Sequence, residues 1–144
     1  MKMRRLVSSG LVLLAIAGCS SEPDAQRVQG IVTVLGSTVG HGNGPALKGE
    51  QCWVGQEETD IVPGLEVRLR DGSGALISLA RLGEPTFTQD HMYDSIKEVA
   101  ECGLPFSFSD VAVEDGIYTV ELDGRGSRNM SSSELDGLVT LAIN

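Results

Sequence analysis

The chain has 144 residues, of which 11 are Lys or Arg and 20 are Asp or Glu. This acidic balance argues against binding to nucleic acid or to an anionic lipid surface, because both need basic patches. The hydrophobic fraction of 41% is high enough to form a core and argues against disorder. Beyond the N-terminal segment about 120 residues remain, which is enough for one domain and not for two.

The N-terminal segment has the order of a bacterial lipoprotein signal. Three basic residues within 2–5 precede a mostly apolar run over 6–17, and the segment ends in Gly18-Cys19. The run is too short for a stable membrane-spanning helix, which needs about 20 residues. The order resembles a lipobox, in which the cysteine is lipidated and becomes the first residue of the mature protein. An ordinary secretory signal, with Cys19 as an unmodified thiol, is the alternative.

The lipobox resemblance implies a division of the chain and a location. We expect a signal peptide over 1–18, a lipidated Cys19 with a flexible tether over 19–26, and one domain over 27–144. Two acyl chains of the palmitate type suffice for stable membrane residence. The domain would then lie on the extracytoplasmic face of the cell membrane, or at the outer membrane if the cell has one. After cleavage it would carry 8 basic and 20 acidic residues, a formal charge of −12.

The sequence of the first half of the domain predicts strands separated by glycine-rich turns. A β-branched stretch over 28–35 predicts the first strand, and a glycine-rich loop follows over 36–51. Cys52-Trp53-Val54 is interpreted as a return of the chain into the core. Strict alternation over 64–70, a turn at 71–74 and a partner segment over 75–82 predict a β-hairpin.

The second half continues this pattern after one interruption. Residues 88–100 contain good helix formers with apolar residues at helical spacing, which predicts a short helix or an ordered loop. Strands are predicted over 105–113, 117–122 and 138–143, with a turn at 114–116. Ser131 and Glu134 have capping-box spacing and predict one helical turn. The sum is an all-β fold, an antiparallel β-sandwich of about six or seven strands with one short helix or ordered loop inserted near 88–100.

Two cysteines remain after lipidation of Cys19, namely Cys52 and Cys102. An even number of cysteines in an oxidising compartment predicts a disulfide bond. A redox or metal-binding pair is the alternative, but neither cysteine lies in a CxxC motif or beside a histidine.

A series of structural motifs follows the lipobox along most of the chain: Val28-Gln-Gly-Ile, Asp60-Ile61-x-x-Gly64, Val67 to Asp71-x-x-Gly74, Cys102-x-x-Pro-Phe-x-Phe108, Tyr118-x-Val120 and Ser133-Glu134-Leu135. In this order of motifs the chain resembles small uncharacterised actinobacterial-type lipoproteins. The resemblance implies an immunoglobulin-like or transthyretin-like sandwich and brings no established activity.

No arrangement of residues in the sequence predicts catalysis. The only two histidines, His41 and His91, have no spacing that suggests a metal site. The stretch 44–50 has the glycine spacing of a phosphate-binding loop but lacks its Lys-Ser/Thr ending. A serine-hydrolase elbow and an EF-hand loop are also missing. We therefore expect a protein that is not an enzyme and holds neither cofactor nor metal.

These observations favour a membrane-anchored, non-catalytic binding or adaptor module of the cell envelope. Its partner would be an unknown envelope protein or ligand, and nucleic acid is not expected. The candidate contact surface is the 84–101 insertion together with the 37–51 loop, because loops on a rigid scaffold commonly carry recognition. Two alternatives stay open: the insertion covers one end of the core, or the protein carries a small apolar ligand such as a lipid inside the sandwich. The candidate contact residues are Phe87, His91, Met92 and Tyr93.

Overall fold

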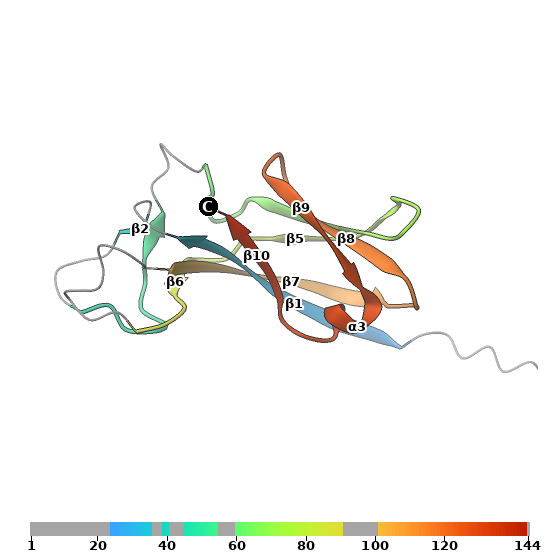
Figure 1. Ribbon diagram of the computed structural model, residues 1–144, viewed down its shortest axis with the longest axis horizontal. Coiled ribbons are helices and arrows are strands. Elements are labelled where there is room, and N and C mark those ends of the chain that lie inside the picture. Colours follow the sequence, from blue (N-terminus) through green and yellow to red (C-terminus); the bar gives the residue numbers. More distant parts are fainter. Residues whose placement is uncertain (1–23, 36–38, 41–44, 55–59, 91–100, 144) are drawn as a thin grey trace, which may run out of the picture.

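A computed structural model describes residues 24–35, 39–40, 45–54, 60–90 and 101–143 of the chain. Within these residues the chain forms a β-sandwich of two four-stranded sheets, with a separate two-stranded ribbon at one end (Figure 1). The all-β sandwich predicted from the sequence is thus confirmed. The elements in chain order are β1 (Ala25–Leu35), β2 (Val39–Gly40), β3 (Trp53–Val54), β4 (Glu66–Arg70), β5 (Leu76–Arg81), β6 (Thr86–Phe87), β7 (Glu101–Ala112), β8 (Ile117–Leu122), β9 (Gly126–Ser131), α3 (Ser132–Leu135) and β10 (Val139–Ile143).

The two sheets differ in how their strands are paired. The first sheet has the order β10-β1-β7-β6, and the second has the order β5-β4-β8-β9. All pairs of the second sheet are antiparallel. In the first sheet β1 runs antiparallel to β7 but parallel to β10, so the sandwich is not antiparallel throughout. The parallel pair arises because the chain crosses from the second sheet back to the first after β9, through α3.

The predicted hairpin over 64–82 is confirmed as β4 and β5. Val67 and Leu69 point into the core and are fully buried. The alternate residues of the strand, Glu66, Arg68 and Arg70, face outward. The turn is held by the carboxylate of Asp71, whose Oδ1 accepts hydrogen bonds from the backbone N–H groups of Ser73 and Ala75 at 2.9 and 3.0 Å. Gly74 has a φ of +86°, a conformation that favours glycine.

A glycine and an aromatic ring face each other across the middle of the first sheet. Gly30 on β1 pairs with Phe106 on β7, and the phenyl ring covers the position where a side chain of residue 30 would lie. The ring also packs edge-on against Phe108, with centroids 5.5 Å apart. The rest of the core is mostly aliphatic, as the composition suggested. Its largest fully buried members besides Phe108 are Phe87, Ile61, Leu69, Leu104, Leu122 and Leu135.

Several strands differ from the predicted pattern, and β7 and β9 differ most. The strand predicted over 105–113 begins earlier, at Glu101, and contains Pro105. The carbonyl of Pro105 accepts a hydrogen bond from Gly83 on the side away from β1, where β6 has already ended. The missing N–H of Pro105 therefore leaves no ladder bond unmade. The strand β9 was not predicted, because Met130 is its only fully buried residue.

The helical turn predicted at 131–134 is confirmed as α3. The carboxylate of Glu134 accepts hydrogen bonds from the backbone N–H of Ser131 at 2.7 Å and from its hydroxyl at 3.0 Å. The helix or ordered loop predicted near 88–100 lies mostly outside the described residues, since 91–100 are not described. Residues 88–90 are not helical. Within the described part of the chain, no helix combines the length and apolarity needed to cross a membrane.

Candidate contact surface

The long β1–β7 pair separates two ends of the sandwich. Ala25 pairs with Ala112 at one end, and Leu35 pairs with Glu101 at the other. At about 3.3 Å per residue these ends lie roughly 30 Å apart. Figure 1 shows the start of β1 on the right and the ribbon of β2 and β3 on the left. We call the end at Ala25 the tether end.

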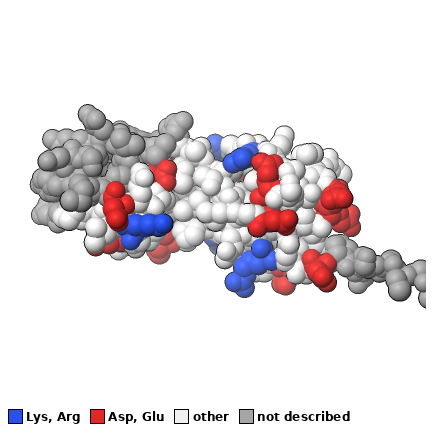
Figure 2. Space-filling model, turned by 60° about the horizontal axis from the view of Figure 1, so that its bottom comes forward, with Lys and Arg blue, Asp and Glu red and all other residues white. Residues whose placement is uncertain are grey.

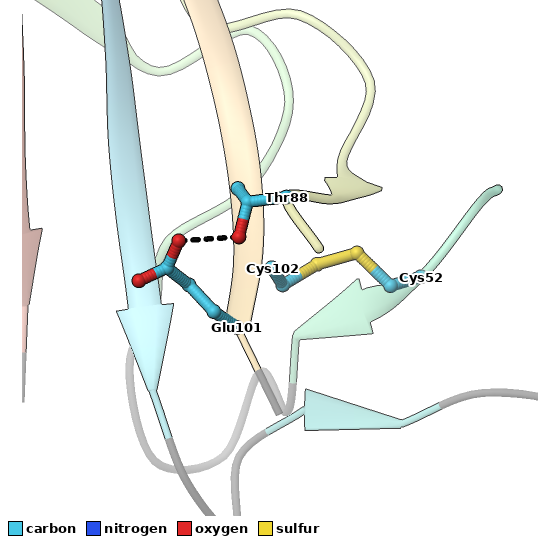
Figure 3. The surroundings of a disulfide bond; sticks show 4 residues. All are labelled: Cys52, Thr88, Glu101 and Cys102. Atoms are coloured by element: carbon cyan, nitrogen blue, oxygen red, sulfur yellow. Dashed lines mark hydrogen bonds between the residues drawn. A yellow bond between two sulfur atoms is a disulfide. The ribbon is translucent and has the colours of Figure 1, made fainter. Parts of the chain in front are cut away.

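A disulfide bond lies at the far end from Ala25. Cys52 and Cys102 are linked, with their Cα atoms 6.2 Å apart, and both side chains are buried. Beside the bond, the hydroxyl of Thr88 donates a hydrogen bond to the carboxylate of Glu101 (Figure 3). The predicted disulfide is thus present, and it fastens the segment before β3 to the first residues of β7.

The two segments named as a contact surface lie side by side in their described parts. Gly49 donates a backbone hydrogen bond to the carbonyl of Phe87, and Phe87 donates one to Glu50, each at 2.9 Å. Cys52 donates a third to Pro85 at 3.2 Å. Residues 45–54 and 84–90, here called the disulfide platform, therefore form one unit held by backbone hydrogen bonds, and the disulfide bond links this unit to β7.

The structure corrects the role expected for one candidate contact residue. Phe87 is only 2% exposed and belongs to the core, so its side chain cannot form part of a contact surface. Its burial agrees with the alternative in which this segment covers one end of the core. The other three candidates, His91, Met92 and Tyr93, lie outside the described residues. The lipidation site Cys19 lies outside them as well.

Trp53 occupies a position that the sequence analysis did not predict. Its neighbours Cys52 and Val54 point into the core as expected, but Trp53 points outward and is 54% exposed. The period of two in a strand explains this, because a residue between two inward-facing neighbours must face solvent. Trp53 borders a shallow surface hollow of about 170 Å³ whose rim includes Pro63 and Pro85.

The platform therefore presents a large amphipathic ring on a rigid base. Leu47 lies on the same platform and is also about half exposed. Within the described part of the chain, no three His, Cys, Asp or Glu residues group in a way that would hold a metal ion. The chain matches no family model, no curated protein and no solved structure.

Proposed function

We propose that the protein is a lipid-anchored lipoprotein of the extracytoplasmic membrane face, and that its sandwich is a non-catalytic binding or adaptor module of the cell envelope. The observation that carries the binding role is Trp53, a half-exposed tryptophan on the disulfide platform. Tryptophan is enriched among the residues that dominate binding energy at protein interfaces, since it buries much apolar area at a low cost in conformational entropy.

The anchor follows from the lipobox resemblance and fits the position of β1. The strand begins at Ala25, a few residues after Cys19, so the tether end faces the membrane in an anchored protein. The disulfide platform would then lie about 30 Å farther out, at the end accessible to envelope components. A disulfide bond also fits an oxidising compartment outside the cytoplasm.

Charge at the tether end affects how closely this end approaches the lipid. Glu114, Asp115 and Asp136 border one shallow hollow there, next to Gln26 of β1. Figure 2 shows acidic side chains gathered at the end where β1 begins. An anionic bilayer surface repels such an end over about one Debye length, which is roughly 8 Å at physiological ionic strength. The tether end would therefore stand off the lipid rather than lie flat on it.

The alternative of a ligand inside the sandwich has less support. The residues that face each other between the sheets are large and fully buried, among them Phe108, Leu69 and Leu104. Every buried side-chain nitrogen or oxygen in the described part of the chain has a hydrogen-bond partner. The space between the sheets is thus occupied by the protein's own side chains, and recognition at the surface is the simpler proposal.

Substitution of the lipidation site tests the anchor. We expect Cys19→Ala to abolish acyl modification, measured by intact mass, and to release the protein from washed membranes. Recovery of the variant in the membrane fraction at high salt, without acyl chains, would contradict the anchor. This test does not depend on the platform.

Site-specific photocrosslinking tests the binding role in cells that produce the full chain. A photoreactive amino acid replaces Trp53 in one variant and Leu138 in a control. Leu138 is 64% exposed and lies beside Arg27 near the tether end. We expect position 53 to give a discrete adduct with one envelope component, identified by mass spectrometry, and position 138 to give none with that component.

A competition step makes the crosslinking result specific. The partner identified at position 53 should bind the unmodified protein and lose at least about tenfold in affinity on Trp53→Ala, the loss usual for a central aromatic contact. Equal crosslinking at both positions, or unchanged affinity of Trp53→Ala, would refute the platform as the contact surface.

A further inference from the structure

A groove runs between the free edges of the two sheets, at the edge of the first sheet opposite β6. The strands β9 and β10 are edge strands of different sheets, and they lie on the same side of the sandwich (Figure 1). Residues of both strands line the groove, which has a volume of about 450 Å³. This volume falls within the range of small-molecule sites, roughly 300–1,000 Å³.

The groove combines an apolar lining with positive charge. Ala142 and Ile143 supply exposed apolar surface above the buried side chains of Leu122 and Leu141. Arg125 and Arg128 supply two guanidinium groups. Among the described residues that line the groove there is no Asp or Glu. The chain as a whole has nearly twice as many acidic as basic residues. The charge of the groove is thus opposite to that of the protein as a whole.

The position of Arg128 in the groove is set by strand pairing and by one hydrogen bond to β10. It pairs with the inward-facing residue Val120, so its side chain leaves β9 on the inner face of the sheet. Its Nη1 donates a hydrogen bond to the carbonyl of Thr140 on β10 at 3.0 Å. An inward-pointing charge and an occupied edge carbonyl both oppose the addition of a further strand. The groove is therefore better suited to a small ligand than to an extended peptide.

The present partners of the two arginines leave donors for a ligand. Arg125 contacts Asp60 at 2.8 Å and Arg128 contacts Glu134 at 3.5 Å, and both acidic partners are largely exposed. Exposed ion pairs contribute little stability, so a ligand can compete for these cations. Glu134 keeps two hydrogen bonds from Ser131 if Arg128 turns to a ligand. Each guanidinium has five N–H donors, more than these contacts use.

We propose that this groove binds a free long-chain carboxylate, with the acyl chain against Ala142 and Ile143 of β10 and the carboxylate on Arg125 and Arg128. Charge complementarity selects an acid over a neutral lipid, because guanidinium groups form strong, charge-assisted hydrogen bonds with carboxylates. The proposal does not depend on the disulfide platform, which carries a different surface.

Photolabelling of the full, membrane-anchored chain in lipid nanodiscs tests the proposal. The probe is a long-chain fatty acid with a photoreactive group in its chain. Its methyl ester and a photoreactive phosphatidylglycerol are the comparison probes. We expect the acid to label peptides that contain residues 122–128 and 140–143, and unlabelled acid to compete. Equal labelling by the ester, or stronger labelling by the phosphatidylglycerol, would overturn the proposal.

Arginine variants supply the second arm. We expect Arg125→Gln and Arg128→Gln each to reduce labelling by the acid about tenfold or more, since each removes a charge-assisted contact. Arg81→Gln is the control, because Arg81 lies on β5, at the other edge of the second sheet, where it contacts the carbonyl of Gly64. Among the described residues, the side chain of Arg125 forms no hydrogen bond or ion pair with β10. Arg125→Gln therefore tests the proposal even if Arg128→Gln fails to fold. Unchanged labelling of Arg125→Gln would refute the carboxylate site.

Discussion

The hydroxyl of Tyr118 forms two hydrogen bonds with the backbone of Glu114, in the connection between the two sheets. It donates to the carbonyl of Glu114 at 2.9 Å and accepts from its N–H at 2.8 Å. The chain leaves the first sheet after β7 and enters the second at β8, so these bonds lie at a corner of the sandwich. A tyrosine bonded to the backbone a few residues upstream is a recurrent feature of such corners in immunoglobulin-type sandwiches.

Removal of this hydroxyl should destabilise the fold without changing its core. We expect Tyr118→Phe to lower the free energy of unfolding by about 1–3 kcal/mol, because two backbone groups lose their partner in a half-buried site. Chemical denaturation followed by circular dichroism measures the change. The control is Thr119→Val, because the hydroxyl of Thr119 donates its hydrogen bond to the exposed Asn129. The effect of this control on the free energy of unfolding should stay within about 0.5 kcal/mol. Equal effects of the two variants would contradict the assigned role of the corner.

Gly30 should tolerate no side chain, because the ring of Phe106 occupies the space above it. A Cβ atom at position 30 would lie 2.1 Å from the ring. We expect Gly30→Ala to cost about 1–3 kcal/mol of unfolding free energy, the range typical of overpacking. Gly116→Ala is the matched control, since nothing lies within 4 Å of its Cβ position and its φ is not positive. That variant should be neutral or slightly stabilising.

A double variant separates the ring contact from other causes. The cost of Gly30→Ala should fall sharply when Phe106 is already replaced by alanine, because the clash has then gone. Additive costs would show that the strain at Gly30 has another origin.

Loss of the disulfide should weaken the platform more than the opposite end. The bond closes a loop of 50 residues, which corresponds to at most about 4 kcal/mol on the chain-entropy estimate. We expect Cys52→Ser with Cys102→Ser to lower the free energy of unfolding by up to that amount. Hydrogen exchange should accelerate over 45–54 and 85–88, and β4 and β8 should keep their protection in native conditions.

The disulfide prediction has a direct chemical check. Digestion without reduction should yield Cys52 and Cys102 in one linked peptide pair. Two freely alkylated thiols in the folded protein, or uniform loss of exchange protection in the double variant, would contradict the local role described here.

Acid should destabilise the protein through two turn carboxylates. The backbone N–H and the hydroxyl of Ser131 lower the pKa of Glu134 below its usual 4.5. The hydroxyl of Ser73 and the backbone N–H of Ala75 lower the pKa of Asp71 below its usual 3.8. The unfolded chain then binds protons more tightly at both sites. Stability from these groups is complete above the usual values and is lost as the pH falls through the lowered ones.

Replacement of the two acids checks this pH dependence. We expect Asp71→Asn and Glu134→Gln each to flatten the decline of unfolding free energy below about pH 4, measured by denaturation from pH 7 to 2. A decline as steep as in the unmodified protein would contradict the assignment to these turns.

Several features of the fold were fixed by local chemistry and were therefore readable from the sequence. Alternation in β4 and β8 marks which side chains enter the core, because the period of a strand is two. The Asp71 turn and the Ser131–Glu134 capping box depend on residues close together in the chain. The Cys52–Cys102 bond was predicted from the two cysteines that remain if Cys19 is lipidated.

Other features depend on contacts between distant parts of the chain. The strand β9 has little sequence signal, since an edge strand buries few residues, and its pairing with β8 defines it. The sequence could not show that Phe87 is buried, because the burial of a side chain depends on which distant elements pack over it. The parallel pairing of β10 with β1 likewise follows from the course of the chain between the sheets.

The sequence by itself determined the all-β class, the hairpin, the helical turn and the cysteine pair, because each rests on neighbouring residues or on composition. Tertiary structure alone decided that Trp53 is exposed on the disulfide platform and that Arg125 and Arg128 share a groove with Leu141. The platform joins the segments 45–54 and 84–90, and the groove joins the edge strands of two different sheets. No local pattern carries that information, because strand order and burial depend on all the pairings together.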